Sequence, residues 1–279
     1  MIRLIAFDLD GTVLDEHKKI LPETKKLLER AAQRGIVLVP ATGRPFCGIS
    51  REITRLQGVK YVVTCNGAGI YERDTGVCLY EDCMELGRLL PLLERLEALE
   101  VMADPFLKGK SYMSERKLPL VEQLRVSDEL KEYIYTSRIV VPDLPACLRQ
   151  QGDDVEKLTI NFVEQEDGTR RDYDKVCEVL KEYTDLNVVS GGMHNIEVTK
   201  QDVSKASALR WLGVRLGISR KEMMAFGDSG NDLAMIREAG VGVAMGNAER
   251  EVLSAADYVT KSNEEEGIAY ALHHYIPDL

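Results

Sequence analysis

The chain has 279 residues, with 36 lysines and arginines against 46 aspartates and glutamates, which gives a formal net charge of −10. This acidic balance argues against a general nucleic-acid binder, which would present a clustered basic surface. Hydrophobic residues make up 44% and charged residues 29% of the chain, as in ordinary globular proteins, so disordered and collagen-like classes are excluded.

The apolar runs are also too short for a membrane protein. None approaches the roughly 18 residues that a membrane-spanning helix needs, and the N-terminus does not resemble a secretory signal. The six cysteines and four histidines show no zinc-site spacing. We therefore expect a cytoplasmic protein with reduced thiols, no membrane partner and no nucleic-acid partner.

Strand and helix patterns alternate at the start of the chain. Short runs rich in Val, Ile and Leu predict strands at 4–7, 36–39 and 61–64, and helical spacing predicts helices at 22–34 and 45–56. Two βαβ units in this order imply right-handed crossovers.

A domain-sized stretch of different character follows at 84–190. Helix-like segments at 86–99 and 173–183 accompany strand-like runs at 139–141 and 158–162. We expect this stretch to be an insertion, entered through a hairpin around 69–80 and left through 195–199.

The alternation then resumes. The pattern predicts strands at 223–226, 241–244 and 258–259, a capping box at 219–222, and helices at 204–216, from 231, at 249–255 and from 265. The expected fold is therefore α/β. A doubly wound, Rossmann-like parallel sheet forms a discontinuous core domain (1–83 and 191–279), and an α+β cap domain is inserted at 84–190.

The first chemical motif follows the first predicted strand. Residues i and i+2 of an extended chain project to the same side, so Asp8 and Asp10 converge at the carboxyl edge of the sheet, where open α/β folds bind ligands. Two such carboxylates repel each other and need a cation or a shared proton. Taken alone, the pair is more often an acidic surface turn.

Further polar groups follow other predicted strands. The Thr42 hydroxyl and the Gly43 N–H stand at a predicted helix start, which suits a phosphate or a simple N-cap. Asp228 and Asp232 lie in an acidic loop that suits Mg²⁺, or helix capping. Lys205 is the first residue of a predicted helix, where a cation is electrostatically unfavourable. This position indicates an anionic partner, although a lysine there is more often simply solvated.

Taken together, these motifs resemble the haloacid dehalogenase-like hydrolase superfamily, and within it the Cof-type phosphatases. The resemblance rests on FDLDGT at 7–12, ATGR at 41–44, NGA at 66–68, SK at 204–205, GDSGND at 227–232, AMGNA at 244–248 and ADYVTKSNEEEG at 256–267. The motifs cover both ends of the chain and leave the inserted segment unmatched.

The resemblance implies a role for each matched residue. Asp8 would be the nucleophile that forms an aspartyl-phosphate, and Asp10 would be the general acid and base. The phosphate would be held by Leu9, Thr42, Gly43, Lys205 and Asn231. Mg²⁺ would be bound by Asp8, the Asp10 carbonyl and Asp228, with Arg44, Ser229 and Asp232 in support. The inserted domain would be a cap that closes over the sheet edge and contacts the rest of the substrate.

Charge balance supports this division of roles. The four carboxylates of Asp8, Asp10, Asp228 and Asp232 outweigh one Mg²⁺ and Lys205 even before a dianionic phosphate arrives. Protonating one carboxylate relieves the excess, and a neutral acid is what the leaving group needs. We therefore expect Asp10 to have a raised pKa in the substrate complex.

The predicted function is a Mg²⁺-dependent phosphatase for a small phosphorylated metabolite, a sugar phosphate or a cofactor phosphate. Two alternatives stay open at this point: a phosphosugar mutase of the same superfamily, and a non-catalytic sensor of phosphorylated metabolites. The sequence does not name the substrate or the oligomeric state.

Overall fold

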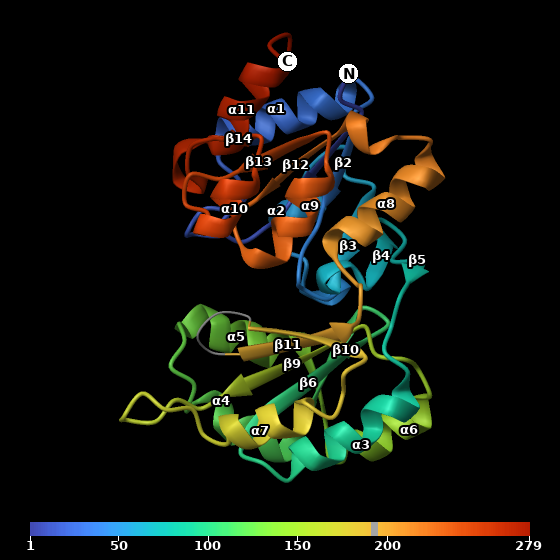
Figure 1. The fold of residues 1–279 in the computed structure, drawn as a ribbon, viewed down its shortest axis with the longest axis vertical. Helices are drawn as coiled ribbons and strands as arrows, with labels where there is room; N and C mark the ends of the chain where they lie inside the picture. Colours follow the sequence, from blue (N-terminus) through green and yellow to red (C-terminus); the bar gives the residue numbers. More distant parts are fainter. Residues whose placement is uncertain (191–194) are drawn as a thin grey trace. The chain divides into compact units, whose positions relative to one another are not determined.

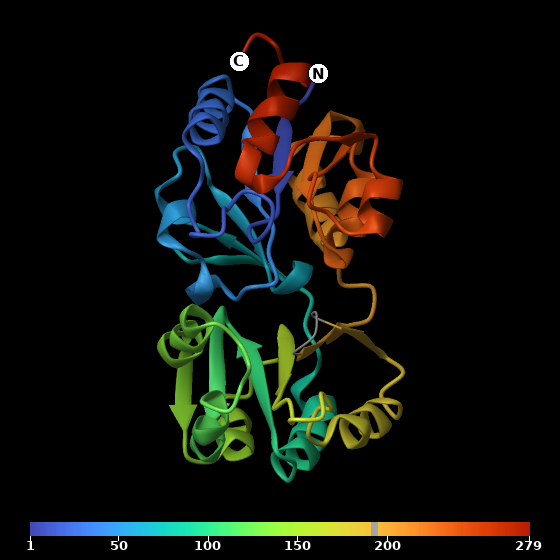
Figure 2. The ribbon, with the colours of Figure 1, turned by 90° about the vertical axis from the view of Figure 1, so that its left-hand side faces the viewer.

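The computed structural model describes residues 1–190 and 195–279, which form two units (Figure 1). The first unit contains Met1–Arg44, Ile49–Tyr80 and Ser204–Leu279, and the second contains Pro45–Gly48 and Glu81–Val203. Both ends of the chain lie in the first unit, so the second unit interrupts it as an insertion (Figure 2).

A five-stranded parallel sheet forms the centre of the first unit, in the order β14-β13-β12-β1-β2. The strands are β1 (Leu4–Phe7), β2 (Val37–Pro40), β12 (Met223–Gly227), β13 (Val241–Ala244) and β14 (Tyr258–Val259). The helices of this unit are α1 (Pro22–Gln33), α2 (Arg51–Arg55), α8 (Lys205–Leu216), α9 (Leu233–Glu238), α10 (Arg250–Ala255) and α11 (Gly267–Tyr275).

Both faces of this sheet are covered because its strands are apolar on both sides. Ile5 and Phe7 of β1 pack in one core cluster with residues of α1 and α11. Leu4 and Ala6 point the other way and pack with residues of α8 and α9. The expected doubly wound α/β core is therefore confirmed.

Two local predictions differ from the structure. The strand β3 (Tyr61–Thr64) pairs antiparallel with β4 (Gly69–Glu72), which neighbours β5 (Cys78–Glu81). It contacts the end of β2 through an isolated bridge between Ala41 and Val63, and the Thr42 N–H donates to the Val63 carbonyl at 2.9 Å. The helix expected at 45–56 is broken into a 3₁₀ turn at Phe46–Gly48 and the short α2. The two pieces are separated at Ser50, which has extended backbone angles. Pro45–Gly48 belongs to the second unit, where the Cys47 N–H donates to the Gly109 carbonyl at 2.8 Å, whereas α2 belongs to the first unit.

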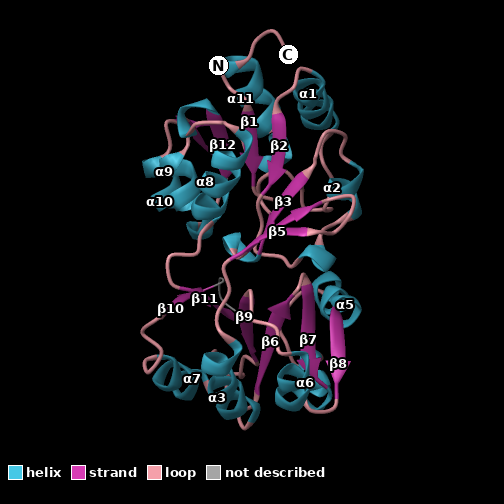
Figure 3. Ribbon diagram, turned by 90° about the vertical axis from the view of Figure 1, so that its right-hand side faces the viewer, coloured by secondary structure: helices cyan, strands magenta, loops and turns pink. Residues whose placement is uncertain are grey.

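A six-stranded sheet forms the centre of the second unit, in the order β10-β11-β9-β6-β7-β8 (Figure 3). Its strands are β6 (Val101–Leu107), β7 (Lys110–Ser114), β8 (Arg138–Val141), β9 (Lys157–Phe162), β10 (Leu186–Ser190) and β11 (Asn195–Lys200). Its helices are α3 (Leu86–Glu97), α4 (Leu118–Val121), α5 (Asp128–Ser137), α6 (Leu144–Gln151) and α7 (Tyr173–Leu180). Side chains of α3, α6 and α7 pack in one core cluster with the sheet.

The cap domain was expected to end at residue 190 and the core domain to resume at residue 191. Residues 191–194 lie outside the described residues. Beyond them, β11 was expected in the core domain, but it belongs to the second unit. The reason is its antiparallel pairing with both β9 and β10. No helix of the described chain is long and apolar enough to cross a membrane.

A buried ion pair in the second unit gives a pH-dependent prediction. Asp104 on β6 accepts a hydrogen bond from Arg138 Nε at 3.2 Å, and its other carboxylate oxygen is buried with no partner among the described residues. Burial raises the pKa of Asp104 from 3.8 to about 6, although Arg138 opposes the shift. The folded state therefore binds more protons than the unfolded state between these values, so this group's contribution to stability falls as pH rises.

We expect Asp104→Asn to remove that dependence. The unfolding free energy of wild type minus that of the variant should fall by about 2 kcal/mol as pH rises from about 4 to 7, because only wild type loses this stabilisation. Urea unfolding of both proteins across this range measures it. A difference that stays constant with pH would show that Asp104 titrates alike in both states.

Candidate active site

The candidate site lies at the carboxyl edge of the parallel sheet in the first unit. Phe7 of β1 is in register with Phe226 of β12, and the Asp8 N–H donates to the Phe226 carbonyl at 3.1 Å. On the other side of β1, the Ala41 N–H donates to the Phe7 carbonyl at 2.9 Å. These pairings place the loops after β1, β2 and β12 side by side, as their order in the sheet requires.

Lys205 lies at the centre of the site. Its Nζ is 2.6 Å from Asp8 Oδ1 and 2.6 Å from Asp232 Oδ1, and its side chain is fully buried. A reciprocal capping box between Ser204 and Ser207 fixes it as the first residue of α8. Burial alone would lower the pKa of Lys205, but attraction to Asp232 and Asp8 outweighs it and raises that pKa. The anionic partners of this helix-start lysine are thus protein carboxylates in this structure.

Asp232 uses both of its carboxylate oxygens. While Oδ1 meets Lys205, Oδ2 accepts from the backbone N–H groups of Asp228 at 3.0 Å and Ser229 at 3.2 Å. A Cβ at Gly227 would lie 2.4 Å from the Asp232 Cβ, so only glycine fits at the end of β12. Asp232 therefore orients Lys205 and shapes the loop that carries Asp228.

Asp228 faces the loop after β1. Its Oδ1 accepts from the Thr12 hydroxyl at 2.6 Å. Gly11 has a φ of +81°, and a Cβ there would lie 2.6 Å from Asp228 Oδ2, so glycine is needed for both its conformation and its size. The two acidic loops are thereby held in direct contact.

The acidic cluster fits a hard divalent cation. Carboxylate oxygens of Asp8, Asp228 and Asp232 lie within 4.8 Å of one another. Burial raises the pKa of Asp8 to about 8, with Lys205 opposing and Asp232 adding to the shift. Burial also raises the pKa of Asp228 to about 6. Both shifts come mainly from burial of the carboxylates, with a smaller contribution from their neighbouring carboxylates, and a bound cation would favour the ionised forms.

Asp10 lies outside that cluster and is bound by cations. Its carboxylate accepts from Arg44 Nε at 2.9 Å, from Arg44 Nη2 at 2.7 Å and from Lys18 Nζ at 2.8 Å. Burial works to raise the pKa of Asp10, but Arg44 and Lys18 outweigh it and leave that pKa below its usual value. The raised pKa that we expect for Asp10 concerns the complex with substrate, so it stays a prediction.

Besides Lys205, the expected phosphate-binding residues lie in the loops that follow β1, β2 and β12. Thr42 is buried, with its hydroxyl accepting from the Arg44 N–H at 3.2 Å, and Leu9 is buried between the two aspartates. Gly43 lies between Thr42 and Arg44 in the loop after β2. Asn231 lies in a 3₁₀ turn at Gly230–Asp232.

Sequence reasoning missed the contribution of Asn66. Its Oδ1 accepts from Asn231 Nδ2 at 3.1 Å, and Asn66 has a φ of 58° in the turn after β3. A Cβ at Gly67 would lie 2.0 Å from the Ser204 carbonyl oxygen, so this turn is pressed against the start of α8. The NGA motif was the available signal, but it gave no role to the asparagine.

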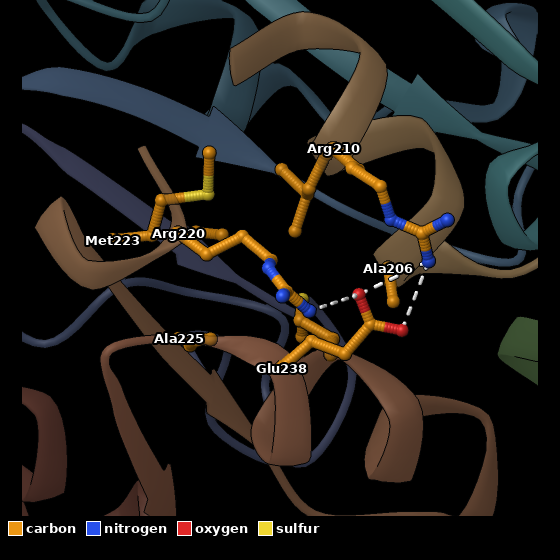
Figure 4. A pocket seen from close by; sticks show the side chains of 10 residues that line it. Ala206, Arg210, Arg220, Met223, Ala225 and Glu238 are labelled. Atoms are coloured by element: carbon orange, nitrogen blue, oxygen red, sulfur yellow. Dashed lines mark hydrogen bonds and ion pairs between the residues drawn. The ribbon is translucent and has the colours of Figure 1, made fainter. Parts of the chain in front are cut away.

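A separate small cavity of about 20 Å³ lies between β12, α8 and α9 (Figure 4). Its charged lining is already paired, because Glu238 accepts from Arg210 at 3.0 Å and lies 3.5 Å from Arg220. It contains none of the expected site residues, so the cluster around Lys205 is the better candidate for chemistry.

Comparison with known proteins agrees with this geometry. The model of the haloacid dehalogenase-like hydrolase family matches residues 5–272, so the chain belongs to that family. It is 30% identical to the 5-amino-6-(5-phospho-D-ribitylamino)uracil phosphatase YitU of Bacillus subtilis, over 98% of this chain and 97% of that protein.

Solved structures show the same likeness. A haloacid dehalogenase-like hydrolase from B. subtilis superposes with a TM-score of 0.81 at 27% identity, covering 99% of this chain and 100% of the other. The subclass IIB sugar phosphatase BT4131 gives a TM-score of 0.77 at 25% identity, covering 98% of both chains. The protein is therefore a phosphatase of this family, as the motifs predicted.

Proposed function

We propose that the protein hydrolyses a small phosphorylated metabolite through a phosphoryl group carried on Asp8, with Mg²⁺ as cofactor. The observation that carries this proposal is the buried carboxylate of Asp8. One of its oxygens is held by Lys205 at 2.6 Å, within an acidic cluster at the edge of the sheet.

In the first step, the Asp8 carboxylate attacks phosphorus and the bond between phosphorus and the ester oxygen breaks. Asp10 gives its proton to the departing oxygen, which leaves as an alcohol. In the second step, Asp10 takes a proton from water, the water oxygen attacks phosphorus, and the bond to Asp8 breaks. Inorganic phosphate leaves and both aspartates return to their starting states.

The remaining residues bind charge. Lys205, the hydroxyl of Thr42, the backbone N–H groups of Leu9 and Gly43, and the Asn231 amide would hold the phosphoryl oxygens. Mg²⁺ held by Asp8, Asp228 and the Asp10 carbonyl would neutralise the negative charge of the phosphoryl group. Ser229 and Asp232 would support this set by fixing the loop after β12.

Asp10 must change partners for this mechanism. A carboxylate bound by Arg44 and Lys18 is held in its ionised form. To become a proton donor, it must lose part of that pairing when the substrate arrives. Arg44 is the natural group to move, since a guanidinium binds a phosphate as well as a carboxylate.

The substrate class is proposed from two relatives. YitU is named for a phosphorylated ribityl compound, and BT4131 is called a sugar phosphatase. Both names describe a phosphate ester of a polyhydroxylated carbon chain. We therefore propose a sugar phosphate or a cofactor phosphate as the substrate.

The Asp10→Asn variant tests the assignment of the acid. An asparagine cannot donate the proton, so we expect kcat/KM on alkyl phosphates to fall by about 10²-fold or more. Aryl phosphates, whose leaving groups need less protonation, should lose less. The kcat/KM values for both ester types measure this, because they report the transfer of the phosphoryl group to Asp8 and not the later attack by water. Full activity of Asp10→Asn on alkyl phosphates would reject Asp10 as the acid.

A further inference from the structure

Two late motifs have no role in the proposed mechanism. They are the turn at 244–248 and the segment at 261–267, and both lie in the first unit. Their backbones are in contact, because the Gly246 N–H donates to the Lys261 carbonyl at 2.9 Å. A Cβ at Gly246 would lie 2.9 Å from the Lys261 carbonyl carbon, so glycine permits this approach.

Side chains from both motifs bind the loop that follows Asp10. Asn247 Nδ2 donates to the Gly11 carbonyl at 2.8 Å, and Asn263 Nδ2 donates to the Leu14 carbonyl at 3.0 Å. The two asparagines are also linked, since the Asn263 N–H donates to Asn247 Oδ1 at 3.1 Å. They form a continuous polar bridge, which we call the asparagine clamp.

The clamp contacts the backbone next to the general acid. Gly11 follows Asp10 directly, so a hydrogen bond to its carbonyl restrains the peptide that joins the two residues. The loop is otherwise closed by its own backbone, through the bond from the Val13 N–H to the Asp8 carbonyl at 3.3 Å and from the Leu14 N–H to the Leu9 carbonyl at 3.0 Å. Among the bonds of the described residues, those of Asn247 and Asn263 tie this loop to the C-terminal motifs, together with the bond from the Glu16 N–H to Glu264 Oε1 at 2.9 Å.

The same turn also holds the loop after β12. The Glu249 N–H donates to the Asp228 carbonyl at 2.8 Å, and the Met245 N–H donates to the Gly227 carbonyl at 3.0 Å. The turn at 244–248 and its next residue therefore contact both acidic loops. This arrangement fixes the position of one loop relative to the other.

We propose that Asn247 and Asn263 are positioning residues that set the place of Asp10 for proton transfer to the leaving group. This inference rests on the proposed function, because it assumes that Asp10 is the acid. Asn247 is solvent-exposed and Asn263 is half-buried. A single hydrogen bond contributes only a small part of the net stability of a domain, so both alanine variants should stay folded.

The test compares wild type with Asn247→Ala and Asn263→Ala on two substrates. They are p-nitrophenyl phosphate and the alkyl phosphate that wild type hydrolyses best. For each variant we expect kcat/KM on the alkyl phosphate to fall about tenfold, because proton transfer to the leaving group is sensitive to small displacements of the acid. On p-nitrophenyl phosphate, kcat/KM should stay within about twofold of wild type. This ratio reports the transfer of the phosphoryl group to Asp8 and leaves out the later attack by water, in which Asp10 acts on the same intermediate for both esters.

Glu266→Gln provides the matched control. Glu266 accepts from the Glu23 and Thr24 N–H groups at 3.0 and 2.8 Å, so it caps α1 from the same segment without touching the Asp10 loop. We expect it to leave the ratio of alkyl to aryl kcat/KM within about twofold of wild type, because it changes only the cap of α1.

Equal losses on both esters, or no loss on either, would overturn the role of the clamp. A failure of the proposed function looks different, since Asp10→Asn itself would then show no preference between the two ester types.

Discussion

The Asp8→Asn variant should lose phosphatase activity while keeping its fold. We expect kcat to fall by about 10³-fold or more, because an amide cannot attack phosphorus as a carboxylate does. The fold should persist, since the amide oxygen can still accept from Lys205 and Asp232 still pairs with that lysine. Phosphate release with Mg²⁺ present and urea unfolding of the same samples measure the two properties.

Asp15→Asn is the matched control for that variant. Asp15 is also buried in the loop after β1, where its Oδ1 accepts from the Lys19 N–H at 2.7 Å, and an amide oxygen can accept the same bond. Its activity should stay near that of wild type. Turnover by Asp8→Asn equal to that of Asp15→Asn would mean that another group attacks phosphorus.

The Lys205→Met variant should be the most destabilised of the single changes. Removing the ammonium leaves Asp8 and Asp232 as buried like charges, and breaking a buried ion pair from one side costs about 3–5 kcal/mol. Activity should vanish as well, because the proposed phosphate site loses its buried cation. Urea unfolding at neutral pH measures the loss of unfolding free energy. A variant that does not fold at all would show a loss larger than the whole stability of the protein.

A double variant separates charge from packing. Adding Asp232→Asn to Lys205→Met removes one of the two unpaired carboxylates, so part of the lost stability should return. If Lys205→Met were as stable as wild type, or if the second change lowered stability further, the buried ion pairs would not be what holds the site together.

The parallel core could be predicted because its signals are local. The apolar runs at β1, β13 and β14 and the spacing of Leu209, Leu212 and Leu216 in α8 require no knowledge of distant residues. The carboxylates of Asp8 and Asp228 could also be placed together, since both follow parallel strands and must meet at one edge.

The misplaced elements depend on long-range pairing. The pattern at 195–200 is compatible with a strand in either unit. Its pairing with β9 and β10 places it in the second unit. The helix expected at 45–56 is divided between the two units, with Pro45–Gly48 in the second and α2 in the first, and helical spacing alone gives no sign of this.

The partners within the site were likewise hidden. Composition and spacing give no sign that Arg44 and Lys18 bind Asp10, or that Asn66 meets Asn231. Each of these contacts joins loops whose path is set by tertiary packing. The roles of Thr42 and Gly43 in binding a phosphate remain predictions.

Trapping the phosphoryl group on Asp8 tests the central claim most directly. The Asp10→Asn variant should accumulate the acyl phosphate, because an asparagine can no longer take a proton from the attacking water. The variant is mixed with p-nitrophenyl phosphate and Mg²⁺, quenched in acid and digested. The masses of its peptides are then measured by mass spectrometry. We expect one added phosphoryl group on the peptide that contains Asp8, and none when EDTA replaces Mg²⁺. Phosphate release by wild type with no label on Asp8, or with the label on another residue, would contradict the account.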